Sequence, residues 1–193
     1  MTIRPLTRAD EDLPILKEML RAAAASPVGE LQQTDLELTR GIPLYRLEPV
    51  AGVQAELAAA RLQAWRYLVL ERREGRAVLV AEVEDQTSGD DEDGRSAAIV
   101  GSGDAAIQLV ERLSAAEALP SDGDYELRII EIPKADVEAL WLHGAGDRFL
   151  DLIRPDRPEP ESAEQFLRRI QTVVELRNRP ENLNAHEMTG DAR

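Results

Sequence analysis

Two neighbouring runs of strand-forming residues constrain the fold more than any other feature. Residues 65–70 and 77–83 are both rich in β-branched, aromatic and aliphatic side chains, which favour extended backbone on a half-buried surface. The short polar segment between them contains Gly75, and a connection of this kind is typical of an antiparallel hairpin. We therefore expect a β-hairpin here and a fold built around a sheet.

Shorter patterns predict the remaining elements. Helices are expected where apolar residues recur every three or four positions, in segments 10–25, 49–60, 104–119 and 162–178. Strands are expected at 97–100 and 127–132, with a second hairpin formed by 139–143 and 148–153, and 42–47 is a candidate for a further short strand. Ser162, followed three residues later by Gln165, is the signature of a capping box at the start of the last helix.

These elements predict an α+β fold in one domain, residues 1–178. Its sheet should be mainly antiparallel, made of two hairpins and one or two further strands, and backed by helices. An acidic loop is expected at 84–95, a Pro-rich linker at 155–160 and a flexible tail at 179–193. The pattern of residues 30–40 predicts no particular structure.

Composition excludes several classes of partner and site. The net charge is −14, with 37 acidic and 23 basic residues, so phosphate backbones and anionic lipid surfaces should repel the chain. We therefore expect neither a nucleic acid nor a membrane as partner. The chain has no cysteine, which removes disulfides, thiolate nucleophiles and cysteine-ligated metals. No run of apolar residues reaches signal-peptide or membrane-spanning length, which favours a cytoplasmic location.

The strongest candidate for a binding site is the turn Gly101-Ser102-Gly103-Asp104. It follows an expected strand and opens an expected helix, and with Ala106 it fits the Gly-x-Gly-x-x-Ala form of the dinucleotide-binding fingerprint. A helix N-terminus at this point would favour a pyrophosphate. Glu131, at the end of the next expected strand, could then hold a ribose hydroxyl. Only 62 residues follow Glu131, too few for the further βα units of a doubly wound dinucleotide fold.

A second interpretation of the same turn comes from a family. Residues 3–10, Ile-Arg-Pro-Leu-Thr-Arg-Ala-Asp, resemble the first strand and helix start of the GNAT acetyltransferases, and the expected element order is similar to that family's. The resemblance implies that Gly101 and Gly103 belong to a loop that binds the pyrophosphate of coenzyme A. Ala98 stands where the family has Arg or Gln, and the resemblance also fits a relative without catalytic activity.

Two other features are weaker candidates. Seven acids and no base lie between Glu82 and Asp93, which is typical of a solvated loop and also suits docking of a basic protein. A calcium loop aligned on Gly94 would put Val100 where a bidentate glutamate is needed, so no metal is expected. His143 could be oriented by Asp147 across a turn as a general base, although no nucleophile accompanies it.

We therefore expect a non-catalytic accessory or structural protein that acts through protein–protein contacts, with another protein or with itself, and that needs no cofactor. The alternative is a coenzyme A- or nucleotide-binding enzyme that uses the turn from Gly101 to Asp104. The enzyme requires a cleft at this turn. In the accessory protein the chain's own side chains should fill the turn.

Overall fold

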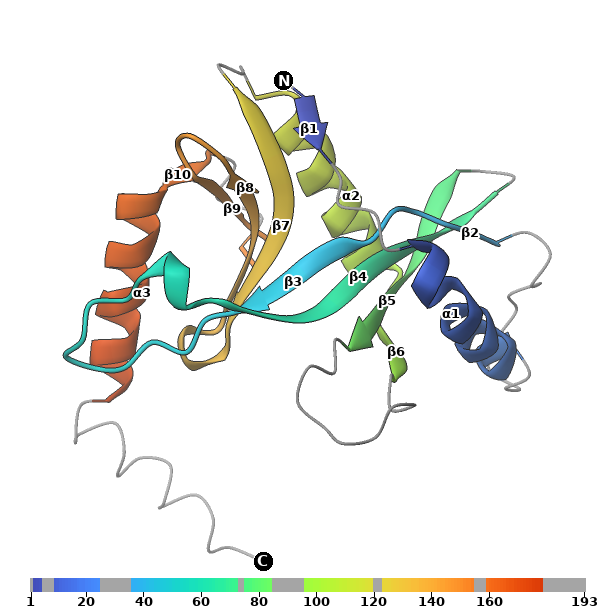
Figure 1. The fold of residues 1–193 in the computed structure, drawn as a ribbon, viewed down its shortest axis with the longest axis horizontal. Coiled ribbons are helices and arrows are strands. Elements are labelled where there is room, and N and C mark those ends of the chain that lie inside the picture. The colour runs from blue at the N-terminus through green and yellow to red at the C-terminus, as the bar shows by residue number, and fades with distance from the viewer. Residues whose placement is uncertain are drawn as a thin grey trace, which may run out of the picture.

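The predicted hairpin is present and belongs to one large sheet (Figure 1). The structure is a computed structural model, and it describes residues 2–4, 9–24, 36–72, 75–84, 96–119, 123–154 and 159–178. Its strands are β1 (Thr2–Arg4), β2 (Leu36–Leu38), β3 (Ile42–Arg46), β4 (Arg61–Glu71), β5 (Arg76–Glu84), β6 (Ala97–Ser102), β7 (Asp124–Ile132), β8 (Val137–His143), β9 (Arg148–Asp151) and β10 (Glu161–Ser162). The helices are α1 (Ala9–Ala24), α2 (Asp104–Glu117) and α3 (Ala163–Arg177), with short 3₁₀ turns η2 (Leu57–Ala59) and η3 (Pro133–Ala135).

Strand order confirms a mainly antiparallel sheet. The order is β10-β9-β8-β7-β3-β4-β5-β6, while β1 pairs with β7 and β2 with β4 outside this path. Among the described strands only the β1–β7 and β3–β7 pairs are parallel. Both predicted hairpins are present, as β4–β5 and β8–β9. The α+β single-domain prediction is therefore confirmed, and the sheet contains more strands than the sequence indicated.

Helices cover both faces of the sheet, which explains why β4 is apolar on both sides. Ala64 and Leu68 of β4 pack in one core with α2. Trp65 and Tyr67 point to the opposite face and pack with α1, because successive side chains of a strand alternate between the two faces. The buried hydroxyl of Tyr67 also donates a hydrogen bond to the carboxylate of Asp12 in α1. In Figure 1, α1 and α3 lie at the two ends of the sheet.

The amphipathic stripe of α3 packs against the chain's own sheet. Phe166 and Ile170 are fully buried, in a core that includes Trp141 and Phe149. The rings of Phe149 and Phe166 are stacked with centroids 4.0 Å apart. The predicted capping box is present, since Ser162 and Gln165 exchange hydrogen bonds. This helix face is therefore occupied and does not remain for another chain.

The helix predicted over 49–60 is wrong. The segment forms an open loop that ends in the 3₁₀ turn η2. Gly52 has a φ of +75°, outside the helical region, and the side chain of Val53 is 57% exposed. The apolar residues at helical spacing do not form one buried helical face, because Val53 is exposed whereas Ala55 is buried and Leu57 packs against the core. Burial rather than periodicity therefore decides the structure of this short segment.

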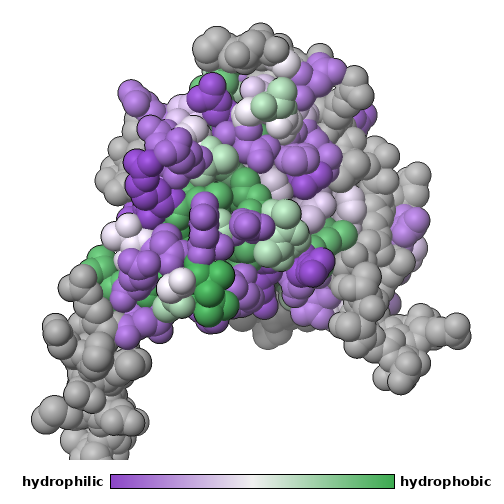
Figure 2. Space-filling view, turned by 60° about the vertical axis from the view of Figure 1, so that its left-hand side comes forward, coloured by the Kyte–Doolittle hydropathy of each residue, from purple (hydrophilic) through white to green (hydrophobic). Residues whose placement is uncertain are grey.

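Several predicted segments lie outside the described residues: 85–95 of the acidic loop, 155–158 of the linker and the tail 179–193. The boundaries of these segments stay predictions. Within the described part of the chain, no helix is long and apolar enough to cross a bilayer. The face that carries α3 is largely hydrophilic, with one hydrophobic area near its centre (Figure 2).

Replacing Phe166 by alanine tests the docking of α3. The substitution Phe166→Ala should lower the free energy of unfolding by about 3–5 kcal/mol, because it leaves a cavity beneath the helix. The matched control is Leu176→Ala, in the last turn of the same helix, whose side chain is 42% exposed and whose loss should cost about 0.5 kcal/mol. Urea denaturation measures both, and equal losses would contradict the packing described above.

Candidate functional site

The turn Gly101-Ser102-Gly103-Asp104 joins the edge strand β6 to α2. Gly101 and Ser102 end the strand, and Asp104 is the first residue of the helix. Gly103 occupies the N-cap position with a φ of +52°, a conformation that glycine adopts without the steric cost of a side chain. Its N–H donates to the carbonyl of Val78 at 3.2 Å, and no side chain caps the helix. Asp104 therefore does not act as the N-cap.

A pocket of about 320 Å³ opens beside this turn. Gly101 and Ala105 form one wall, and a β-carbon built on Gly101 would lie 3.0 Å from the β-carbon of Ala105. A larger residue at position 101 would therefore push the helix away from the strand. The lining residues are Arg66, Val80, Val100, Gly101, Ala105, Gln108, Leu109, Glu138, Leu152 and Ile153.

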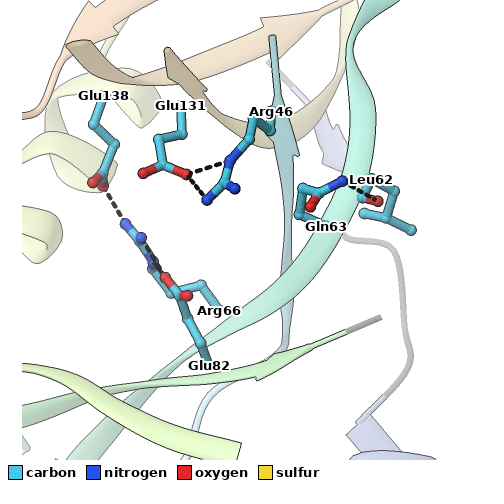
Figure 3. Close-up of polar contacts among 7 residues, drawn as sticks. All are labelled: Arg46, Leu62, Gln63, Arg66, Glu82, Glu131 and Glu138. Atoms are coloured by element: carbon cyan, nitrogen blue, oxygen red, sulfur yellow. Dashed lines mark hydrogen bonds and ion pairs between the residues drawn. The ribbon is translucent and has the colours of Figure 1, made fainter. Parts of the chain in front are cut away.

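Two lining residues, Arg66 and Glu138, belong to a charged cluster whose third member is Glu82 (Figure 3). The Nε of Arg66 donates to Glu82 at 2.7 Å, and its two terminal nitrogens form ion pairs with Glu82 and Glu138. The side chain of Arg66 is 11% exposed, and that of Glu138 is 25% exposed. One guanidinium therefore neutralises two carboxylates only in part, which leaves one negative charge in excess.

The cluster requires a strongly curved sheet. Arg66 and Glu82 are direct cross-strand partners in β4 and β5, but Glu138 lies in β8, and β7 and β3 stand between β8 and β4. In a flat sheet three strand spacings amount to about 14 Å. Curvature of the sheet around α2 brings Glu138 within hydrogen-bonding distance of Arg66. All three side chains point toward the α2 face of the sheet.

A second ion pair lies next to this cluster. Arg46 donates to Glu131 from Nε at 3.2 Å and from a terminal nitrogen at 2.9 Å. Glu131 stands directly opposite Glu138 in the β7–β8 pair, where two like charges normally destabilise a sheet. Each glutamate here has its own arginine, Arg46 or Arg66, so the repulsion is offset. Glu131 does not line the pocket, and it is held by Arg46 where the dinucleotide hypothesis required it to bind a ribose.

The pKa of Arg66 is raised above its ordinary value. Burial lowers this pKa, because it penalises the charged guanidinium, but attraction to Glu138 and Glu82 and hydrogen bonds to the same carboxylates outweigh that penalty. Arg66 therefore remains a cation, and all three of its nitrogens are engaged by the glutamates.

The pocket has the position that a coenzyme A or nucleotide site requires, but it lacks the positive charge that a pyrophosphate requires. A pocket does lie beside the Gly101 turn, as that alternative requires and contrary to the filled turn expected of an accessory protein. The charged cluster that borders it is negative, however, and a pyrophosphate would add further negative charge to a partly buried site. Ala98, where the acetyltransferase family has Arg or Gln, is paired across the strands with Glu82, so no cation stands at this position. The sheet is also not the parallel, doubly wound sheet of a dinucleotide fold.

The predicted contact between His143 and Asp147 is present. The Nδ1 atom of His143 lies 3.0 Å from Oδ1 of Asp147, and the same oxygen accepts the N–H of Gly144 at 3.1 Å. Asp147 therefore orders the turn between β8 and β9, and neither residue lines the pocket. The other histidine, His186, lies outside the described residues.

Two of the seven acids between Glu82 and Asp93 fall within the described residues. Glu82 belongs to the charged cluster, and Glu84 accepts a hydrogen bond from the hydroxyl of Ser96 at 2.8 Å. Among the described residues no group of three or more histidine, aspartate or glutamate side chains is arranged to hold a metal ion.

Sequence reasoning missed the charged cluster, although part of it could be found. Arg66 interrupts an apolar strand and Glu82 interrupts the apolar strand paired with it, so the predicted hairpin already places them near each other. Glu138 follows 72 residues after Arg66 in the sequence, and no local pattern relates the two. Their contact depends on the curvature of the whole sheet.

Comparison of the chain with protein-family models, with curated proteins and with solved structures found no match. The function must therefore be inferred from the geometry of the molecule.

Replacing Arg66 measures what the charged cluster contributes. The substitution Arg66→Met should lower the free energy of unfolding by about 3 kcal/mol, because it leaves two partly buried carboxylates without their cation. Arg168→Met is the control: Arg168 pairs with Glu164 on the exposed surface of α3, and its loss should cost about 0.5 kcal/mol or less. An Arg66→Met variant as stable in urea as the native protein would show that the cluster does not hold the strands together.

Proposed function

We propose that this chain is a non-catalytic accessory protein that acts through protein–protein contacts, and that the outer edge of β6 is its contact surface. The observation that carries the proposal is the position of β6 at the end of the sheet. On one side β6 pairs with β5, and no described strand pairs with its other side.

The composition of β6 supports an edge that receives another chain. Its sequence is Ala-Ala-Ile-Val-Gly-Ser, with neither a charged residue nor a proline. Ile99 is 40% exposed and Val100 is 49% exposed. Proteins usually protect such an edge with lysine, proline or a covering element, because unpaired N–H and C=O groups are a template for a further strand. The described part of β6 has neither lysine nor proline, and no described strand pairs with its outer side.

Charge indicates the kind of partner. The net charge of −14 makes pairing between two copies electrostatically unfavourable and attracts a basic segment instead. The sequence immediately before β6 carries the acids Asp90, Asp91, Glu92 and Asp93, close along the chain to the open edge. We therefore propose that the partner contributes an extended segment of alternating apolar and basic residues, which adds to the sheet as a new strand.

The partner segment can be represented by a short peptide that alternates lysine with valine. Its affinity for the native protein, measured by fluorescence anisotropy, should exceed that of a peptide alternating glutamate with valine. The variant Ile99→Lys should weaken binding of the lysine peptide at least about tenfold, since it places a like charge at the centre of the edge. The control Val53→Lys, at a more exposed valine away from β6, should bind like the native protein.

Sedimentation velocity separates the two kinds of protein contact. A dimer that forms at rising concentration and is lost in Ile99→Lys would assign the β6 edge to a second copy of this chain, which keeps the function and changes the partner. Two results together would contradict the proposal. The lysine peptide would either not bind or bind the native protein and Ile99→Lys equally well, and the protein would show no self-association that depends on Ile99.

A further inference from the structure

The pocket beside Gly101 is a second place where a ligand can bind. It shares Val100 and Gly101 with β6, but it lies between that strand and α2 and not along the outer edge that we propose for the partner strand. We infer that it binds a small organic cation, a protonated amine carried on a short apolar chain, which places its ammonium group against Glu138.

The size of the pocket limits which ligands can enter it. A volume of about 320 Å³ corresponds to about ten water molecules at about 30 Å³ each. This lies at the lower end of the range for small-molecule sites. Coenzyme A would exceed it, whereas a linear or branched aliphatic amine fits within it.

The carboxylates determine the charge of the ligand, because they provide an acceptor for a cation. Oε1 of Glu138 accepts from Arg66, and no described residue donates a hydrogen bond to Oε2 of Glu138. This oxygen belongs to a residue that lines the pocket and to a cluster with one negative charge in excess. An ammonium group would neutralise that charge and supply the missing donor, and charge-assisted hydrogen bonds of this kind are the strong ones.

The walls of the pocket are apolar, which favours a ligand with an aliphatic chain. Val80, Leu109 and Leu152 are buried residues of the same core that line the pocket. Val100 and Ile153 line it as well, although they are 49% and 46% exposed to solvent. A ligand with an aliphatic chain would cover both of them and remove apolar surface from water, which is the main favourable contribution to binding of this kind.

An anion of the same size would be repelled by the excess negative charge of the cluster. Arg66 lines the pocket, but each of its nitrogens already donates to Glu82 or Glu138. An entering carboxylate would bring a second uncompensated negative charge into a partly buried cluster, beside the two carboxylates that already pair with Arg66. The geometry therefore favours the cation over the anion.

The probe is hexylammonium, compared with hexanoate and 1-hexanol, which have chains of similar length with a negative or a neutral head group. Titration of the native protein, followed by the methyl NMR signals of Val100, Leu109 and Ile153, should show saturable binding of hexylammonium with a dissociation constant in the millimolar range. Hexanoate and hexanol should bind at least about tenfold more weakly.

Matched variants locate the ammonium group. Glu138→Gln keeps the shape of the side chain and removes its charge, and it should weaken hexylammonium at least about tenfold. Glu131→Gln removes a neighbouring charge that does not line the pocket, and it should change the affinity by no more than about threefold. Ala105→Leu, at an exposed helix position in the pocket wall, should exclude the ligand even if Glu138→Gln is poorly folded.

Three results would overturn the inference. The first is that hexylammonium leaves the methyl signals of the pocket unchanged in the native protein. The second is that it binds Glu138→Gln and Ala105→Leu as tightly as the native protein. The third is that hexanoate binds as well as hexylammonium. None of these experiments tests strand pairing along the outer edge of β6, so their failure does not contradict the proposed protein contact, and failure of the peptide experiment does not contradict the pocket.

Discussion

The guanidinium of Arg66 connects parts of the sheet that strand pairing alone does not bring together. Through Glu82 it reinforces the β4–β5 hairpin, and through Glu138 it links that hairpin to β8 on the far side of β7 and β3. Partly buried charges are costly unless they are paired, so the three side chains favour the curved form of the sheet in which they meet. The same curvature encloses α2 and leaves the pocket beside Gly101.

Local patterns predicted the elements that depend on local interactions. The alternating strands around Gly75 and the Ser162–Gln165 cap are complete within a few residues, so the sequence alone predicts both. The failures concern segments whose structure is set by distant contacts. Residues 49–60 have helical spacing, but they bury only some of their apolar side chains and do so from a loop. Strands β1, β2 and β10 are two or three residues long and exist only because a longer strand lies alongside.

The candidate site likewise has one part that the local sequence predicts and one part that depends on distant contacts. The Gly101 turn could be found in the sequence, because a glycine is needed where the strand meets the helix closely. The carboxylate that gives the pocket its charge could not, because Glu138 reaches it from another part of the sheet. The structure shows that the Gly101 turn, where the alternative hypothesis expected a pyrophosphate, borders a pocket with excess negative charge. It also shows the amphipathic stripe of α3 to be internal, which leaves the apolar edge of β6 as the contact surface we propose.

Amide hydrogen exchange of β6 in the free protein tests this account most directly. If the outer edge is open, the β6 amides that point away from β5 should exchange orders of magnitude faster than the amides of β5, which are held between β4 and β6. The measurement is made at low protein concentration, so that self-association does not mask the edge. Equal protection of β5 and all of β6 would show that the edge is already covered, and would contradict the proposal that a partner strand pairs there.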